Sequence, residues 1–474
     1  MNLTDKKMCF GVIVGTRDFF NPTLSQEGRR KLKTLLNTLG YDHVVLPADA
    51  TSHSAVETYA HAKLCAALFE SRRQDIDGVI VVLPNFGDEL GVVETLNLAK
   101  LDVPVMVQAC NDDINHVGVF GRRDAFCGKI SVCNNLYQYG IPFTDTTEHT
   151  CDLDSDVFAR DLDRFARICR TVRGLRSARI GAIGARPAAF QTVRYSEKLL
   201  QESGITVIPV DLSDIFARAD QFDDQAADVI AKLADIKAYG HIPAQIPPGQ
   251  IVRQAKFSVA VDAWMAENEC VASAIQCWTS MQKNYGCASC LSMSLMGERG
   301  MPSACEVDVA GTVSMYALLL ASGNIPGFLD WNNNYAYETD KCVCTHCSNF
   351  PKSFMGRDIE ISALDLLGET LGKDNCFGAI KGHVAAGDMS YFRISTDDTL
   401  GIIKAYVGQG EFTDDPFDMD GGIAVCRVER LRELLGHICQ HGYEHHVAMT
   451  RSHCAEILDE AVSKYLGWDL YWHV

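Results

Sequence analysis

Short apolar runs alternate with amphipathic stretches through the first hundred residues, and this alternation constrains the fold more than any other feature of the chain. Strands are expected at 9–14, 42–46, 78–83 and 103–108, and the helices between them at 25–39, 54–72 and 89–99. Strands that are separated by helices pair in parallel, because each connection must cross back over the sheet. The first third of the chain therefore predicts an open, doubly wound α/β sheet.

In such sheets ligands bind at the carboxyl ends of the strands. Polar loops follow three of the expected strands, at 15–18, 85–88 and 111–113. No G-x-G-x-x-G sequence follows the first strand, which argues against a dinucleotide ligand. Arg17 comes directly after this strand and is the best-placed basic group, although a surface ion pair would explain it equally well.

A second α/β unit and then a β-rich region follow along the chain. The second unit is indicated by strands at 178–184 and 205–210, by helices within 212–238, and by further helices at 254–267 and 270–281. After residue 351 the pattern changes to alternating segments at 377–384, 389–394, 401–407 and 421–428, which indicate an antiparallel barrel or sandwich. We expect domains at 1–165, 166–350 and 351–474.

Two acids bracket a very apolar helix and strand in the second unit. Glu306 precedes a helix expected at 309–321, which Gly323 ends, and Asp330 closes the short apolar strand that follows. Carboxylates at the rim of a buried element must be paired, hydrogen-bonded or bound to a cation. The pattern fits a metal site or an acid/base pair, and it also fits acids that merely favour a helix N-terminus.

Charge and apolar content exclude several classes of partner. The chain has 43 basic and 61 acidic residues, a net charge of −18, which argues against nucleic acid or an anionic membrane as a partner. No apolar run is long enough to span a membrane, and the polar residues 1–7 do not resemble a signal peptide. We expect a cytoplasmic protein.

Nineteen cysteines without a secretion signal indicate mostly free thiols. Cys342, Cys344 and Cys347 form the one dense group, and Cys287-x-x-Cys290 is another pair. A zinc or iron–sulfur site would need a fourth ligand at a matching spacing, so buried, apolar cysteines are the simpler interpretation.

Two other segments carry candidate ligand-binding groups. Gln276–Gly286 mixes amides with aromatic rings, a combination that suits polyhydroxylated ligands but also an ordinary core helix. His445 and His446 are adjacent on an expected strand, so only one of them can face inward.

At this point the sequence resembles a known family. The resemblance is carried by five motifs, at 276–286, 302–311, 328–331, 346–351 and 444–448. They are similar to the L-fucose/L-arabinose isomerase family, and most similar to its fucose-isomerase-like branch. The resemblance implies two Rossmann-like α/β domains and a C-terminal antiparallel β-barrel.

The resemblance also implies roles for individual residues. Glu306, Asp330 and His446 match the family's metal ligands, and we expect the two acids to act also as the catalytic groups. Four residues match positions near the sugar: Arg17, Gln276, Trp278 and His346. Arg17 would reach the sugar from a neighbouring subunit, in a trimer or hexamer with shared sites, and His346 would serve as a substrate contact or a fourth ligand.

This ligand set has a coherent chemistry. Two carboxylates and one imidazole suit Mn²⁺, with Mg²⁺ or Co²⁺ as alternatives. Such an ion polarises a sugar carbonyl, while a carboxylate moves a proton between C1 and C2 through an enediol. The expected activity is aldose–ketose isomerisation, an intramolecular oxidoreduction, of an L-fucose- or D-arabinose-like sugar.

Several alternatives to this activity stay open. The same reaction on a sulfonated sugar such as sulfoquinovose would need fixed cations, which could be drawn from five basic residues: Arg17, Arg122, Arg123, Lys129 and Arg186. A non-catalytic sugar-binding protein, or a metal-dependent epimerase or aldolase, would be a different class.

Overall fold

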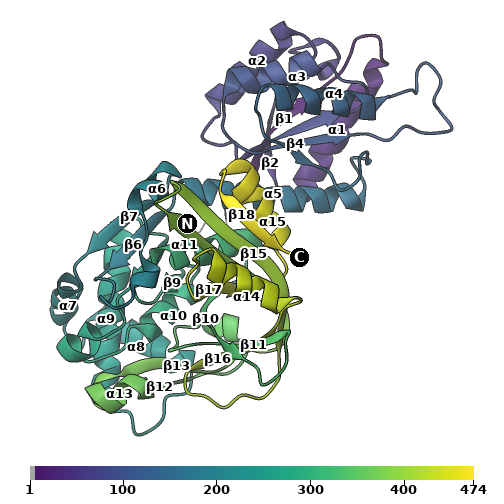
Figure 1. Ribbon diagram of the computed structural model, residues 1–474. Coiled ribbons are helices and arrows are strands. Elements are labelled where there is room, and N and C mark those ends of the chain that lie inside the picture. Colours follow the sequence, from purple (N-terminus) through teal and green to yellow (C-terminus); the bar gives the residue numbers. More distant parts are fainter. Residues whose placement is uncertain (1–5) are drawn as a thin grey trace. The chain divides into compact units, whose positions relative to one another are not determined.

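The computed structural model describes residues 6–474, so the first five residues of the polar N-terminus discussed above lie outside the described residues. The chain forms two compact units (Figure 1). Unit 1 comprises residues 1–173 and 460–467, and unit 2 comprises residues 174–459 and 468–474. Within residues 6–474, none of the helices combines the length and the apolar character needed to cross a bilayer.

Unit 1 is built on a five-stranded parallel sheet with the order β2-β1-β3-β4-β5. Its strands are β1 (Cys9–Val14), β2 (Asp42–Val45), β3 (Gly78–Leu83), β4 (Val105–Ala109) and β5 (Thr144–Asp145). The helices are α1 (Pro22–Thr38), α2 (Tyr59–Ser71), α3 (Glu89–Ala99), α4 (Ala125–Gln138) and α5 (Asp156–Arg176). Every residue of β1, β3 and β4 is buried, as expected for strands covered on both faces. The predicted doubly wound sheet is confirmed here.

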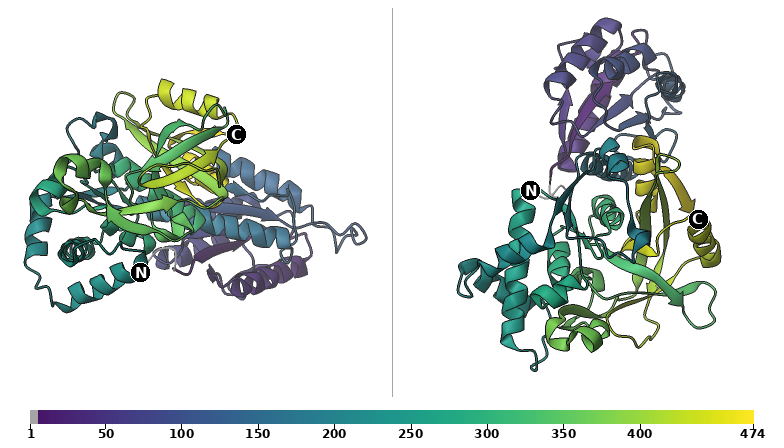
Figure 2. Two further views of the ribbon diagram at one scale, coloured as in Figure 1. Left: turned by 90° about the horizontal axis from the view of Figure 1, so that it is seen from below. Right: turned by 60° about the vertical axis from the view of Figure 1, so that its left-hand side comes forward.

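Unit 2 contains a second parallel sheet, with the order β7-β6-β8-β9. Its strands are β6 (Arg179–Ile183), β7 (Thr206–Val210), β8 (Ala272–Ile275) and β9 (Ser303–Ala304). The helices in this part of the chain are α6 (Glu197–Glu202), α7 (Leu212–Asp220), α8 (Ala227–Tyr239), α9 (Pro248–Glu267) and α10 (Cys290–Glu298). In the right-hand view of Figure 2, the teal helices lie on one side of unit 2 and the green and yellow strands on the other.

The helix predicted at 270–281 is wrong. Ala272–Ile275 forms β8, which pairs in parallel with β6 on one side and with β9 on the other. Periodicity alone does not distinguish a short, fully buried strand from a buried helical segment. The long-range pairing of β8 with β6 decided the outcome.

Helix α11 (Val309–Ser322) is the central element of unit 2 and agrees with its prediction. Residues 309–321 are all buried, and the helix contacts β8 of the parallel sheet as well as β14 and β17 of the larger sheet. Asp308 caps its first turn by accepting a hydrogen bond from the amide of Gly311, and Gly323 ends it in the left-handed conformation.

The C-terminal half contributes a nine-stranded mixed sheet with the order β12-β13-β16-β11-β10-β17-β14-β15-β18, in which β15 also pairs with β16. Its strands are β10 (Gly327–Asn334), β11 (Lys341–His346), β12 (Glu360–Ala363), β13 (Phe377–His383), β14 (Gly387–Asp397), β15 (Ile402–Thr413), β16 (Gly422–Arg427), β17 (His446–Thr450) and β18 (Asp469–His473). The remaining helices are α12 (Lys352–Met355), α13 (Asp365–Leu371), α14 (Leu431–Gln440) and α15 (Ala455–Asp459). The predicted antiparallel β structure is confirmed as part of this mixed sheet, whereas a closed barrel stays a prediction.

The prediction that Asp330 ends its strand is wrong, because β10 continues to Asn334. Only the first three residues of β10 are buried, so the apolar run that suggested the strand covers less than half of it. The polar remainder pairs with β11 at the surface.

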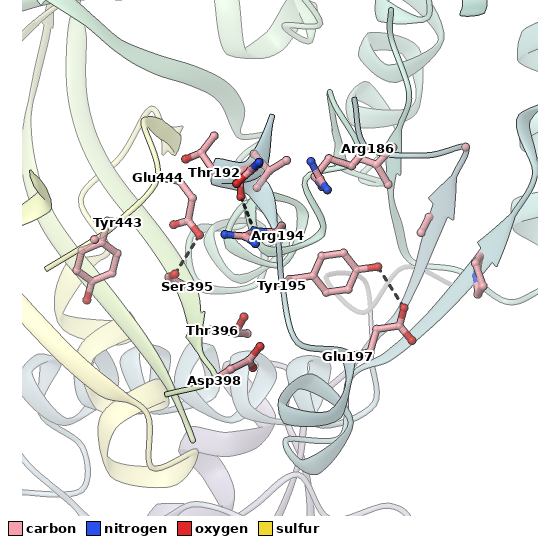
Figure 3. A pocket seen from close by; sticks show the side chains of 17 residues that line it. Arg186, Thr192, Arg194, Tyr195, Glu197, Ser395, Thr396, Asp398, Tyr443 and Glu444 are labelled. Atoms are coloured by element: carbon pink, nitrogen blue, oxygen red, sulfur yellow. Dashed lines mark hydrogen bonds between the residues drawn. The ribbon is translucent and has the colours of Figure 1, made fainter. Parts of the chain in front are cut away.

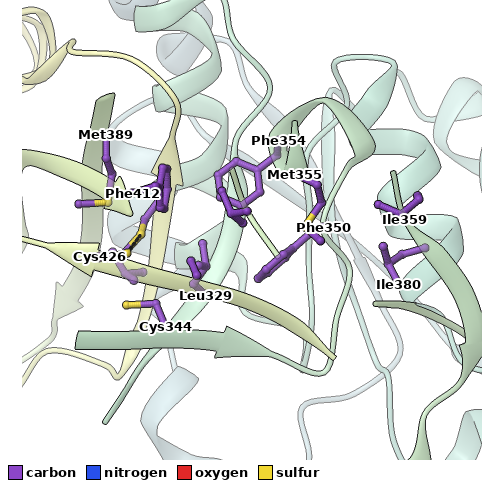
Figure 4. Packing of buried hydrophobic residues seen from close by; sticks show 14 of the residues in the cluster. Leu329, Cys344, Phe350, Phe354, Met355, Ile359, Ile380, Met389, Phe412 and Cys426 are labelled. Carbon is purple, nitrogen blue, oxygen red and sulfur yellow. Dashed lines mark hydrogen bonds between the residues drawn. The ribbon is translucent and has the colours of Figure 1, made fainter. Parts of the chain in front are cut away.

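The cysteines of β11 belong to the hydrophobic core of unit 2. Figure 4 shows Cys344 and Cys426 among Leu329, Met389 and Phe412. The thiols of Cys342 and Cys344 lie 3.6 Å apart, and both side chains are buried. These two cysteines act as small apolar residues, in agreement with the simpler interpretation of the sequence.

Candidate functional site

Four side chains from four separate segments converge in unit 2. Glu306 follows β9, Asp330 lies in β10, His346 ends β11 and His446 begins β17. The sheet register explains the convergence, because Asp330 is directly opposite His446 on one side and opposite Thr345, the neighbour of His346, on the other. Side chains on neighbouring strands at the same register lie close together.

The polar ends of these side chains point at one another. Nε2 of His446 lies 3.4 Å from Oδ1 of Asp330 and 3.7 Å from Oε2 of Glu306. Nε2 of His346 lies 3.6 Å from the same Glu306 oxygen. The three predicted metal ligands are therefore brought together, and His346 joins them.

Two carboxylate oxygens at this point have no hydrogen-bond partner. Oε2 of Glu306 and Oδ1 of Asp330 are buried and accept no hydrogen bond in the described structure. A buried, unsatisfied carboxylate oxygen is costly unless a cation balances it. Ligand atoms around one octahedral divalent ion lie about 3 Å apart. The distances between the nitrogen and oxygen atoms of these side chains are close to that value. The residues present thus fit a divalent cation.

The backbone at Glu306 is strained. Glu306 and Val307 adopt the left-handed conformation, with φ values of 56° and 57°. This conformation is unusual for side chains other than glycine, and especially for a β-branched residue. Strain of this kind is concentrated at functional sites, where the surrounding structure holds it in place.

Comparison with known proteins matches two segments of the chain to models of one family. Residues 11–176 match the N-terminal domain of the fucose/sulfoquinovose isomerases, and residues 344–473 match the C-terminal domain of L-fucose isomerase. The chain belongs to the fucose isomerase-like family. The protein is therefore a sugar isomerase, and the non-catalytic sugar-binding alternative is set aside.

The curated relatives that match this isomerase carry the name sulfoquinovose isomerase. The chain is 25% identical over 390 residues to the sulfoquinovose isomerases of Priestia aryabhattai and Priestia megaterium, and the match covers 81% of this chain and 83% of each relative. It is 26% identical over 293 residues to the sulfoquinovose isomerase of Alkalicoccus urumqiensis, covering 60% of this chain and 63% of that protein.

A buried charge network supports His446 in the isomerase. Asp308 accepts a hydrogen bond from Arg393 at 2.6 Å and lies 2.8 Å from Nδ1 of His446. Arg393 also donates to Glu444 at 3.2 Å, and Glu444 accepts a hydrogen bond from Ser395. Burial alone would raise the pKa of Asp308, but Arg393 and His446 outweigh it and hold this pKa well below its usual value.

The sequence pattern does not indicate this network. A position at a helix end is enough to account for Asp308, and Arg393 belongs to none of the motifs described above. Arg393 is the one charged residue in the mostly apolar run at 389–394, and it is fully buried. A charge inside such a run requires a buried partner, and this is the signal that could have found it.

Aromatic rings line one side of the site. The ring of Phe190 lies 5.4 Å from Trp278, 5.5 Å from His445 and 5.8 Å from His446, measured between ring centroids. Nε1 of Trp278 donates to Oε1 of Glu306 at 2.9 Å. Trp278 therefore lies beside the candidate metal ligands, its contact with a sugar stays a prediction, and Phe190 is an addition that the sequence did not suggest.

Gln276 and the two histidines of the C-terminal pair have distinct positions. Oε1 of Gln276 accepts a hydrogen bond from the amide of Ala185 at 2.9 Å, so Gln276 supports the loop after β6. The side chain of His446 is 1% exposed and that of His445 is 40% exposed. The prediction that only one histidine faces inward is confirmed.

A second set of donor atoms adjoins the first. Atoms of Cys305, Glu306, His346 and Cys347 lie within 4.8 Å of one another. The thiol of Cys277 also donates to Oε1 of Glu306 at 3.1 Å. Glu306 therefore has thiols as well as imidazoles around its carboxylate.

Arg17 belongs to unit 1 and is described within that unit alone. Its Nη2 lies 2.6 Å from Oε2 of Glu89, and its guanidinium lies 4.4 Å above the ring centre of Phe86. The ion pair considered from the sequence is present. The proposed contact of Arg17 with a sugar stays a prediction.

Proposed function

We propose that this isomerase is a metal-dependent aldose–ketose isomerase in which Glu306, Asp330 and His446 hold one divalent cation, with Mn²⁺ as the first candidate. The convergence of two unpartnered carboxylate oxygens on the same imidazole nitrogen supports this proposal. His346 is close enough to act as a fourth ligand or to contact the sugar. Mixed carboxylate and imidazole donors suit Mn²⁺, Mg²⁺ or Co²⁺.

A bound cation would polarise the sugar carbonyl and lower the pKa of the neighbouring hydroxyl. Proton movement between C1 and C2 is assigned to the carboxylates of Glu306 and Asp330. Burial raises the pKa of Glu306, but the neighbouring His346 and His446 outweigh burial and keep this pKa below its usual value, so the carboxylate is ionised and able to accept a proton.

The two carboxylates differ in access. The side chain of Asp330 is 26% exposed and that of Glu306 is 5% exposed. Trp278 and Cys277 both hydrogen-bond to Glu306, so this carboxylate is held in place. Asp330 has the greater freedom to follow a proton between two adjacent sugar carbons.

Metal removal tests the proposal. We expect EDTA treatment to abolish isomerisation and Mn²⁺ to restore it, with one ion bound per chain. Glu306→Gln and Asp330→Asn should lose both the ion and the turnover. Asp235→Asn, a change at an exposed acid on α8, should keep both. Full turnover in protein shown to be free of metal would reject the proposal.

The substrate has two candidate classes. The resemblance to fucose isomerases favours an L-fucose- or D-arabinose-like sugar, while the relatives named sulfoquinovose isomerase favour a sulfonated hexose. Parallel assays of L-fucose, D-arabinose, L-arabinose and sulfoquinovose, with products identified by NMR, separate the two classes.

The finer architecture is also part of the proposal. We keep the division into domains at 1–165, 166–350 and 351–474, with the strands of the last domain closed into a barrel. A trimer or hexamer would let Arg17 reach the sugar bound by a neighbouring subunit. Light scattering, and activity of mixed oligomers that combine Arg17→Ala and Glu306→Gln chains, test this arrangement.

A further inference from the structure

A polar cavity of about 800 Å³ lies in unit 2 (Figure 3). Ala182, Gly184 and Pro209 line it, so it lies at the carboxyl ends of β6 and β7. This is the edge of a parallel sheet at which ligands bind. Its volume suits a sugar-sized molecule.

The cavity adjoins the candidate metal site. The same sheet edge carries Trp278 after β8 and Glu306 after β9. Val307, which follows Glu306, and Glu444, which precedes the histidine pair, both line the cavity. The loop that forms another wall, residues 184–197, also carries Phe190, whose ring packs against Trp278 and His446. A molecule at the metal site therefore has this cavity beside it.

Two arginines in the cavity have no acidic partner. Within residues 6–474, neither Arg186 nor Arg194 forms an ion pair. Arg186 donates to the carbonyl oxygens of Pro187 and Ala188, and Arg194 donates to that of Gln191. Both guanidinium groups are thus held by their own loop while their charge stays uncompensated.

The acidic residues that line the cavity have other partners or lie away from Arg186. Glu444 is bound to Arg393 and Ser395, and Glu197 accepts a hydrogen bond from Tyr195. Asp398 lies beside Thr396, away from Arg186 in Figure 3. The two arginines therefore bring to the cavity a positive charge that none of these acids neutralises in an ion pair.

We propose that Arg186 and Arg194 bind an anionic group, a sulfonate, at the end of the sugar remote from the reacting carbons. This inference rests on the proposed function, because it assumes that C1 and C2 lie at the metal site. Guanidinium groups match the oxygens of a sulfonate by charge-assisted, bidentate hydrogen bonds. The hydroxyls of Thr192, Ser395 and Thr396 lie in the same cavity and suit sugar hydroxyls.

The position of the cavity also distinguishes among the five basic residues that the sequence offered for binding an anion. Three of the five are held in ion pairs in unit 1, namely Arg17, Arg122 and Lys129. Arg123, also in unit 1, donates to a backbone carbonyl. Arg186 is the one that lines this cavity, and Arg194 joins it.

The test compares a sulfonated sugar with a neutral one. The ratio of kcat/KM for sulfoquinovose to that for its 6-deoxy counterpart, quinovose, should fall roughly 100-fold in Arg186→Met/Arg194→Met, mainly through KM. Lysine at both positions should recover only part of this ratio. Arg218→Met, which removes a partly exposed arginine on α7 of the same unit, is the charge-matched control and should leave the ratio as in the wild type. An unchanged ratio in the double methionine variant overturns the inference.

Calorimetry on EDTA-treated protein separates this inference from the proposed function. Binding of sulfoquinovose that depends on the two arginines, in a protein that isomerises no sugar even after it is reloaded with Mn²⁺, would retain the pocket and reject the isomerisation. Turnover of sulfoquinovose that ignores both substitutions would retain the isomerisation and reject the pocket. Tighter binding of glucose 6-phosphate than of sulfoquinovose would overturn the assignment to a sulfonate.

Discussion

Oδ2 of Asp308 lies 2.8 Å from Nδ1 of His446, and this contact decides which nitrogen of the imidazole faces the two metal-site carboxylates. Because the pKa of Asp308 is held well below its usual value, the carboxylate is ionised and accepts a hydrogen bond from the N–H at Nδ1. In the neutral imidazole this leaves the lone pair on Nε2, which points at Asp330 and Glu306. A carboxylate behind a metal-binding histidine orients the ring and raises its basicity.

Asp308→Asn should weaken metal binding by about 10- to 100-fold, since it removes the charge that selects this tautomer. Asparagine still caps a helix, so α11 should keep its N-terminus. Metal titration by calorimetry measures the effect. Asp211→Asn, at the exposed N-cap of α7, is the matched control, and equal affinity in the two variants would contradict the role of Asp308.

Arg393→Met should lower the free energy of unfolding by about 3–5 kcal/mol, because it leaves the carboxylates of Asp308 and Glu444 buried without their cation. Arg427 provides the comparison, since it also pairs with two acids, Asp340 and Glu411, but its side chain is 44% exposed. Arg427→Met should cost no more than about 1 kcal/mol. Urea unfolding of both variants checks this difference, which should be absent if burial of the network is unimportant.

Acid should destabilise the metal-free protein partly through Asp308. The folded-state pKa of Asp308 is depressed, so its stabilisation is present above the unfolded-state pKa of about 3.9 and is lost as the pH falls toward the folded-state value. Between about pH 5 and pH 2 the wild type should therefore lose stability more steeply than Asp308→Asn. Urea titrations at several pH values measure the free energy of unfolding of both proteins. If this free energy changed with pH to the same extent in the wild type and in Asp308→Asn, the assignment would be contradicted.

Gly311→Ala should destabilise the protein by about 1–3 kcal/mol through overpacking. A Cβ at this position would meet the ring of Phe328 and lie 2.8 Å from Nη1 of Arg393, both of which are buried. Gly436 lies in α14, where an added Cβ would meet nothing within 4 Å, so Gly436→Ala should be neutral or stabilising. Thermal unfolding of the two variants provides the measurement, and a neutral Gly311→Ala would show that the site can relax.

Local patterns were sufficient for several parts of this protein. The strand–helix alternation of unit 1, helix α11 with its Gly323 end, and the inward orientation of only one histidine of the His445–His446 pair follow from periodicity and capping, which act over a few residues. The two acids that flank α11 could be identified as candidate site residues for the same reason, because their apolar neighbours in the sequence already imply that they are buried. The resemblance to sugar isomerases then supplied the roles that these patterns leave open.

Tertiary structure decided the rest. Residues 272–275 form a strand because β6 and β9 pair with it, and Asp330 meets His446 because β10 and β17 share a register. Asp308, Arg393 and Phe190 act at the site through contacts with residues far away in the sequence, 138 positions in the case of Asp308 and His446. The physical reason is that a buried charge or an unpaired strand edge has no preferred partner within its own segment; the partner is selected only when the packed elements bring the two together.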